Sequence, residues 1–206
     1  MFYLYKEWLG PRVKGNMTSA GCFLHLKSKT GNLDINKIYK PKEICPPFYQ
    51  EYLDQVPDDG NLLIHLQDIL ADTEELVNEI PPEKLTYAYA EGKWTIKDIL
   101  VHLCDAERVF IYRALRFSRG DETALPGFEE KTFAEYAGAN NREIADIMRE
   151  YSLVRESSIA FIESLTEVSL ARKGTANGHV ISVRLILNLI YGHHKHHINV
   201  IHEKYL

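Results

Sequence analysis

The chain has 206 residues, enough for one domain with an additional arm, and its 45% hydrophobic and 26% charged residues are typical of a globular protein. A net charge of -5 disfavours nucleic-acid binding, which needs clustered Lys and Arg, and the lack of a basic run disfavours attachment to a membrane surface. The three cysteines are too few for a disulfide framework, and no stretch approaches the roughly 20 apolar residues of a membrane span. We therefore expect a cytoplasmic protein with no nucleic-acid or membrane partner.

Residues 1–40 differ from the rest of the chain because they lack helical periodicity and carry scattered Gly, Lys and Ser. We interpret them as an irregular, poorly ordered N-terminal arm, and residues 41–206 as the folded domain. One hypothesis is that the arm is an upstream extension, with folding starting near Tyr39. N-terminal sequencing of the protein from its native source would test this hypothesis.

Two long amphipathic helices are predicted in the first half of the folded domain. Apolar residues recur at helical spacing over residues 61–80, and the two prolines that follow, Pro81 and Pro82, end the predicted helix. The second helix is predicted over residues 95–118. Its first residues, Thr95-Ile96-Lys97-Asp98, resemble a capping box.

Two more helices are predicted in the second half. After a second candidate capping box at residues 132–135, an apolar stripe predicts a helix over residues 142–165. Residues 172–179 contain two glycines and are predicted to form a loop, and Ser182 can cap a last helix that runs to Lys204. No strand pattern is long enough to build a sheet. The sequence therefore predicts an all-α fold, a four-helix bundle.

Nine histidines are present, and four of them fall within residues 193–197. His193 and His197 are four residues apart and share a helix face with apolar residues, so both rings can reach one metal ion at about 2.0–2.1 Å. The pair His193 and His196 is a weaker alternative. Spacing alone is equally compatible with hydrogen-bonded core histidines or a solvated patch. The zinc-protease motif is absent, because His194 stands where that motif has its glutamate, and no general base is implied.

A metal site needs a third protein ligand, and His102 is the best candidate. It lies in the middle of the second predicted helix beside Ile99 and Leu103, where a polar side chain requires a partner. His65 on the first helix is the rival. Spacing cannot choose between the two, although His65 is more readily explained as a half-exposed helix position.

Other residues of the second helix are candidates for supporting roles. Asp105 follows His102 by one turn and could orient it, but a salt bridge with Arg108 or Arg113 explains Asp105 equally well. Tyr112 and Arg113 could face the cavity and bind the anionic groups of a substrate.

Several segments together resemble the DinB-like (DinB/YfiT-like) superfamily of metalloenzymes. They are Gly92-Lys93-Trp94-Thr95-Ile96-Lys97-Asp98, His102-Leu103 and the stretch from Gly192-His193 to His196-His197. The order of a Trp-led helix start, a mid-helix His and a late His-x-x-x-His makes the resemblance fairly specific. It covers roughly residues 44–206, and residues 105–108, 112–116 and 125–128 resemble one branch of the family. We interpret Trp94 itself as a packing residue at the helix start.

The resemblance implies a four-helix bundle that holds one divalent metal ion, zinc or nickel, on three histidines, which match His102, His193 and His197. Family members are often homodimers, and no DNA binding is implied. Characterised relatives include thiol-dependent transferases and isomerases that use bacillithiol, mycothiol or glutathione. His194 departs from the family, because many relatives have an acidic residue there. This departure leaves open what orients His193, and makes His194 a further candidate for contact with the site.

We therefore expect a metal-dependent enzyme acting on a small molecule, in which the ion activates either a low-molecular-weight thiol for transfer or water for hydrolysis. A non-catalytic bundle that binds a metal or a small ligand is the alternative. A third hypothesis is a bundle whose histidines are simply core and surface residues, and metal analysis would separate it from the other two.

Overall fold

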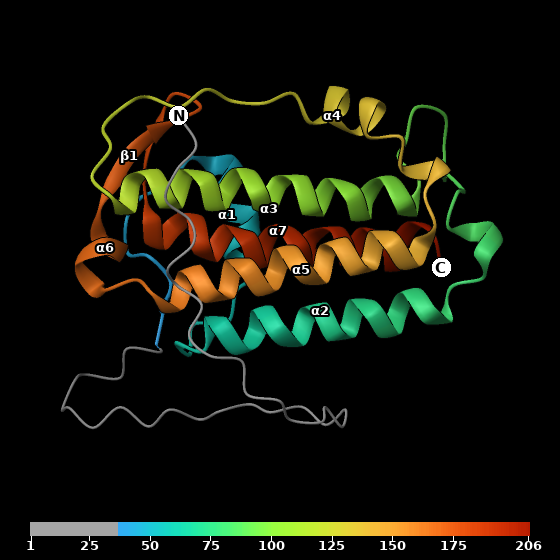
Figure 1. Cartoon of the computed structure of the whole chain (residues 1–206), viewed down its shortest axis with the longest axis horizontal. Helices are drawn as coiled ribbons and strands as arrows, with labels where there is room; N and C mark the ends of the chain where they lie inside the picture. The colour runs from blue at the N-terminus through green and yellow to red at the C-terminus, as the bar shows by residue number, and fades with distance from the viewer. Residues whose placement is uncertain (1–36) are drawn as a thin grey trace, which may run out of the picture. The chain divides into compact units, whose positions relative to one another are not determined.

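A computed structural model describes residues 37–206 of the chain (Figure 1). The arm predicted at residues 1–40 therefore lies almost wholly outside the described residues. Of its last four residues, Ile38 is buried, and its backbone N–H donates to the carbonyl of Gly60 at 2.8 Å. Ile38 thus packs with the domain, slightly ahead of the predicted boundary at residue 41.

Four long helices form the bundle, as predicted: α2 (Leu62–Glu79), α3 (Ile96–Ser118), α5 (Ile144–Glu163) and α7 (Val183–Lys204). They lie lengthwise beside one another in Figure 1. Helix α3 packs against α5 and α7, and α2 packs against the same two helices, so α2 and α3 are diagonal neighbours. Lys97 contacts Arg142 and Glu107 contacts Arg155, which shows that α3 and α5 run in the same direction.

Two helix starts are capped as predicted, and one is not. The Thr95 hydroxyl accepts from the N–H of Asp98 while the Asp98 carboxylate accepts from the N–H of Thr95, which completes the capping box of α3. The Ser182 hydroxyl accepts from the N–H of Leu185 at the start of α7. The prediction of a capping box at residues 132–135 is wrong. Helix α4 (Glu130–Ala137) begins before it, and its N-cap, Glu129, makes no side-chain capping bond.

Shorter elements join the long helices. Helix α1 (Pro47–Asp54) packs on α7, and η1 (Pro82–Lys84) links α2 to α3. Because α3 and α5 are parallel, the chain between them must return along the bundle, and it does so as a long strap that carries α4 and η2 (Ala139–Asn141) beside α3 (Figure 1). Helix α6 (Glu167–Ala171) follows α5.

A small antiparallel hairpin corrects the prediction of a loop at residues 172–179 and of no sheet. Strand β1 (Lys173–Ala176) pairs with β2 (His179–Ser182), with Lys173 opposite Ser182. Asn177 and Gly178 connect them with φ angles of 51° and 77°, as a type I′ turn requires. Strands of four residues are too short to show an alternation of apolar and polar side chains. The Asn177-Gly178 pair was therefore the local feature of the sequence that indicated a hairpin.

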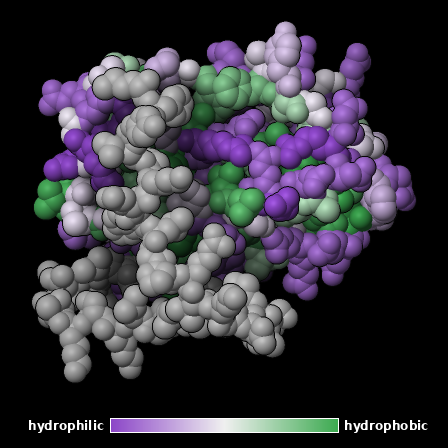
Figure 2. Space-filling view, viewed as in Figure 1, coloured by the Kyte–Doolittle hydropathy of each residue, from purple (hydrophilic) through white to green (hydrophobic). Residues whose placement is uncertain are grey.

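The apolar stripes of the four helices form the core, as amphipathic helices must bury that face. None of the described helices is long and apolar enough to cross a membrane. On the outside, a groove of about 690 Å³ runs between α3 and α5. Figure 2 shows hydrophobic side chains exposed among hydrophilic ones on the face that these helices form. The exposed apolar residues of this α3–α5 groove include Tyr112, Leu115 and Leu153.

Candidate metal centre

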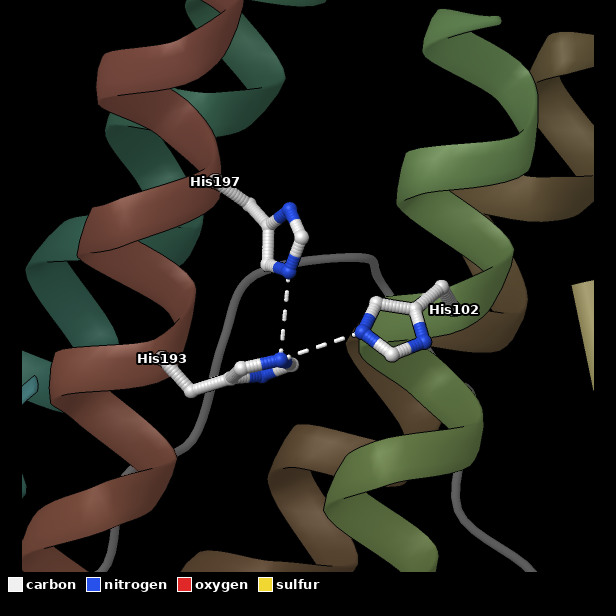
Figure 3. Close-up of side chains that lie close together, drawn as sticks. All are labelled: His102, His193 and His197. Atoms are coloured by element: carbon white, nitrogen blue, oxygen red, sulfur yellow. Dashed lines mark hydrogen bonds between the residues drawn. The ribbon is translucent and has the colours of Figure 1, made fainter. Parts of the chain in front are cut away.

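Three imidazole rings meet between α3 and α7 (Figure 3). The Nε2 atom of His193 lies 3.0 Å from Nε2 of His102 and 3.1 Å from Nε2 of His197. One ligand nitrogen from each ring falls within 4.8 Å of the other two. The structure thus brings the three predicted ligands to one point.

The local structure explains why they meet. His193 and His197 are one turn apart on α7, so their rings project from the same face. Helix α3 packs against that face and contributes His102. His102 is 2% exposed and His193 is 4% exposed, whereas His197 is partly buried. The cluster therefore lies inside the bundle, with His197 nearest to solvent.

Burial keeps these imidazoles neutral at physiological pH. It lowers the pKa of His102 to about 4, and it lowers the pKa of His193 and His197 well below the usual value. A neutral imidazole offers a nitrogen lone pair, which is the form that binds a metal. A tetrahedral ion with bonds of about 2.05 Å holds its ligand nitrogens about 3.3 Å apart, within a few tenths of an ångström of the two distances observed. The donor set therefore fits a divalent cation such as zinc.

Aromatic rings enclose the cluster. The Trp94 ring lies 4.6 Å from His102 and stacks on His197 at 6.1 Å, centroid to centroid. Tyr52 of α1 and Phe110 of α3 make edge contacts with His193, at 5.4 and 5.8 Å. Trp94 thus packs as interpreted from the sequence, and does so directly on two candidate ligands. Sequence reasoning did not assign Tyr52 or Phe110 to the site, because nothing local connects the short helix α1 to His193.

Neither alternative ligand reaches this centre. His65 places its Nε2 atom 3.0 Å from a carboxylate oxygen of Asp59, at the half-exposed helix position that the sequence favoured for it. His196 packs its ring edge-on against Tyr52 and is not part of the cluster.

The supporting residues proposed on α3 lie elsewhere. Asp105 bonds to Arg108, with 3.3 Å between Oδ1 and Nη1, and makes no hydrogen bond to His102. Tyr112 is half-exposed in the α3–α5 groove, where its hydroxyl accepts from Arg116. Arg113 is buried, and its Nη2 donates to the carbonyl of Pro126 at 2.9 Å.

His194 belongs to a second buried cluster rather than to the metal centre. Its Nε2 atom lies 2.8 Å from the Thr73 hydroxyl, and its Nδ1 lies 2.8 Å from the Tyr151 hydroxyl. Because the Thr73 hydroxyl donates to the carbonyl of Ile69, Nε2 of His194 carries the proton and Nδ1 accepts. The ring is therefore held from both sides, by α2 and α5.

A buried ion pair adjoins His194. Arg155 donates through Nε and Nη2 to the two carboxylate oxygens of Glu107, each at 2.9 Å, and its Nη2 also lies 3.2 Å from Nδ1 of His194. Both side chains of the pair are at most 2% exposed. Local pattern does not predict this pair, since a single charge beside an apolar stripe is usually a surface residue.

The chain is similar to known proteins over most of the described domain. The profile of the DinB superfamily matches residues 65–201, a span that contains all three clustered histidines. A protein of Oceanobacillus iheyensis is 25% identical over 178 residues, covering 80% of this chain and 89% of that protein. One of Geobacillus thermodenitrificans is 28% identical over 117 residues, covering 56% and 66%. Both are named, provisionally, as metal-dependent hydrolases.

A solved structure has the same fold. YfiT from Bacillus subtilis, described as a probable metal-dependent hydrolase with an unusual four-helix bundle topology, superimposes with a TM-score of 0.61 at 18% identity. The match covers 83% of this chain and 95% of YfiT. With the profile match spanning most of the domain and the bundle shared, the chain belongs to the DinB superfamily.

Proposed function

We propose that this protein is a metal-dependent hydrolase whose divalent ion, zinc or nickel, is held by His102, His193 and His197. The observation that carries the proposal is the convergence of three neutral Nε2 atoms inside the bundle. Three protein ligands with a remaining open position are typical of catalytic rather than structural zinc sites.

The donor set determines the chemistry available. A divalent ion bound there supplies a Lewis acid that lowers the pKa of a water or thiol in its open position. All three ligands are neutral, so no ligand offsets the ion's charge. Trp94, Tyr52 and Phe110 pack against the cluster, and His102 and His193 are buried, so the surroundings of the centre are less polar than water and electrostatic interactions there are stronger.

Hydrolysis is supported by the names of the two bacterial relatives and of YfiT. Thiol transfer is the second candidate, because an all-histidine site also favours an anionic thiolate. In the described part of the chain, no carboxylate hydrogen-bonds to the three histidines.

Metal analysis of tag-free protein tests the proposal, followed by assays with ester and amide panels and with thiols plus electrophiles. We expect about one ion per chain in the wild type and in His202→Ala, an exposed control on the same helix, and little in His193→Ala. Catalytic turnover should be seen in the two proteins that hold the ion and should be lost in His193→Ala. Metal without any turnover would indicate a binding module instead, and a metal-free wild type would reject the proposal.

A further inference from the structure

We propose that residues 129–138 of the strap, which include helix α4, form a lid that must open to admit substrate to the metal centre. This inference rests on the proposed function and extends it by naming the segment that controls access to the site. These residues are called the α4 lid below. Their position beside the centre, their weak attachment and the glycine at their end all support the proposal.

The α4 lid extends from Tyr52 to Trp94, two aromatic residues that pack on the three histidines. At its first turn, the Glu130 carboxylate lies near Tyr52 of α1, because burial and the negative charge of Glu130 together raise the pKa of the Tyr52 hydroxyl. One turn further along α4, Ala134 and Glu135 line a pocket of about 550 Å³ that Trp94 also lines. Helix α4 lies on the outside of α3 (Figure 1).

These two aromatic residues form the side of the metal centre that is nearest to solvent. Tyr52 packs on His193, and Trp94 packs on both His102 and His197. The two aromatic residues and His197 are partly buried, whereas the other two histidines are buried. The pocket reaches Trp94 but is not lined by any of the three histidines. The lid, and the indole beside it, must therefore move before a substrate in the pocket can reach the ion.

The strap is attached firmly on both sides of the lid. Ahead of it, the N–H of Leu125 donates to the carbonyl of Thr175 in the hairpin at 2.9 Å. After it, Oδ1 of Asn140 accepts from the Thr95 hydroxyl at 2.8 Å, and its Nδ2 donates to the Asp98 carboxylate at 3.2 Å. A movement of the lid can therefore leave the rest of the strap in place.

The lid itself is attached weakly. Of residues 129–138, Ala134 and Ala137 are partly buried and all the others are exposed. Tyr136 is 82% exposed although it is aromatic. Helix α4 has only eight residues, and its N-cap, Glu129, makes no side-chain capping bond. Helices this short are marginal on their own, so α4 can open at a small cost while the four long helices stay folded.

Gly138 gives the lid a hinge with a defined closed state. Its φ angle is 62°, in the left-handed region that residues with a side chain adopt only at a cost. A Cβ atom added there would meet no atom within 4 Å, so Gly138→Ala strains the backbone of the closed lid without causing a clash. Gly120 lies at the opposite end of α3 from Trp94, with a φ angle of 78° and equally open space. Gly120→Ala is therefore a matched control.

Hydrogen exchange in the metal-free protein measures the opening of the lid. Amides of α4 should exchange roughly a thousandfold faster than the core amides of α3. Gly138→Ala should speed the exchange of α4 about fivefold more, because the strain destabilises the closed state, whereas Gly120→Ala should leave it unchanged. Exchange in α4 as slow as in α3, or equal in Gly138→Ala and wild type, would overturn the proposal.

Zinc removal by the chromogenic chelator pyridylazo-resorcinol connects this opening to the metal centre. The chelator has to reach the ion, so zinc should leave Gly138→Ala about fivefold faster than it leaves the wild type, and should leave Gly120→Ala at the wild-type rate. Faster exchange in α4 with unchanged zinc removal would overturn the lid and leave the proposed function standing. A wild type that binds no zinc or nickel would reject the proposed function and, with it, the role of α4 as a lid, even if α4 opens.

Discussion

His193 and His194 are neighbours on α7, yet their rings enter two different buried clusters. His193 faces His102 and His197 on the α3 side, while His194 is held between Thr73 of α2 and Tyr151 of α5. Consecutive helical residues point about 100° apart, so these two neighbours can belong to different clusters. His193 lies in the candidate metal centre, and His194 lies in the second buried cluster, with Thr73 and Tyr151. The two histidines should therefore respond differently to substitution.

His194→Ala should destabilise the fold without releasing the metal. The change leaves the buried Tyr151 hydroxyl without its acceptor and takes from the Thr73 hydroxyl, which still donates to Ile69, the proton of Nε2, and together these losses cost about 2–3 kcal/mol in the free energy of unfolding. Urea denaturation of the metal-free proteins measures the loss, and elemental analysis of the loaded proteins measures the metal content. Loss of metal at unchanged stability would place His194 in the metal centre instead.

The metal-free protein should lose stability as the pH falls below about 6.5, the pKa of histidine in an unfolded chain. Burial lowers the pKa of His102 to about 4, and it lowers those of His193, His194 and His197 well below the usual value. Between these values the unfolded state binds more protons than the folded state, so acid favours unfolding. The expected slope is about 1.4 kcal/mol per pH unit for each histidine.

Urea denaturation after chelation, at several pH values between about 7.5 and 5, measures this slope. His102→Leu should reduce it by the share of one histidine, and His202→Ala, which removes an exposed ring, should not change it. A free energy of unfolding that stays constant over this range would contradict the buried, neutral state of the cluster.

The sequence predicts the bundle well because its helices are long and strongly periodic. The stripes of α2, α3, α5 and α7 repeat over many turns, and Thr95 and Ser182 mark two helix starts chemically. The hairpin was missed because its strands are short and its register depends on an Asn-Gly turn. The Glu107–Arg155 pair was missed for a different reason. Its burial depends on α3 and α5 running parallel, and local pattern does not show which helices are neighbours.

The candidate site, too, is predictable from local sequence only in part. The spacing of His193 and His197 is a local property of one helix, so sequence alone suggests the pair. Choosing His102 over His65 requires knowing which helix packs beside His193 and His197, and which of its residues lies opposite them. Family resemblance supplied this choice, and the structure brings His102 to the pair while His65 bonds to Asp59.

Arg155→Met should be strongly destabilising, by about 3–5 kcal/mol, because it leaves the Glu107 carboxylate buried without its cation. The double variant Glu107→Leu with Arg155→Met should recover much of the loss, since two apolar side chains can pack where two charges stood. Denaturant unfolding measures both. As a matched control, Glu167→Ala removes the exposed partner of Arg184 and should cost less than about 1 kcal/mol. A loss for Arg155→Met as small as the control's would show that the pair is hydrated in solution.

Gly192→Ala should disturb the metal centre through the backbone of α1. A Cβ atom at this position would stand 2.2 Å from the carbonyl oxygen and 2.6 Å from the carbonyl carbon of Tyr52, so α1 must move away from α7. Tyr52 packs on His193, the residue after the glycine, and the movement should open that side of the centre.

We expect Gly192→Ala to lose about 1–3 kcal/mol of stability from overpacking and to bind zinc more weakly than the wild type. Denaturant unfolding and competition with a chromogenic chelator measure the two effects. Lys195→Ala, on the same helix and less buried, is the control, and neither quantity should change much. Unchanged stability in Gly192→Ala would mean that α1 is not packed against α7 at Tyr52. Unchanged zinc affinity alongside lowered stability would mean that the contact between Tyr52 and His193 does not support the three-histidine geometry.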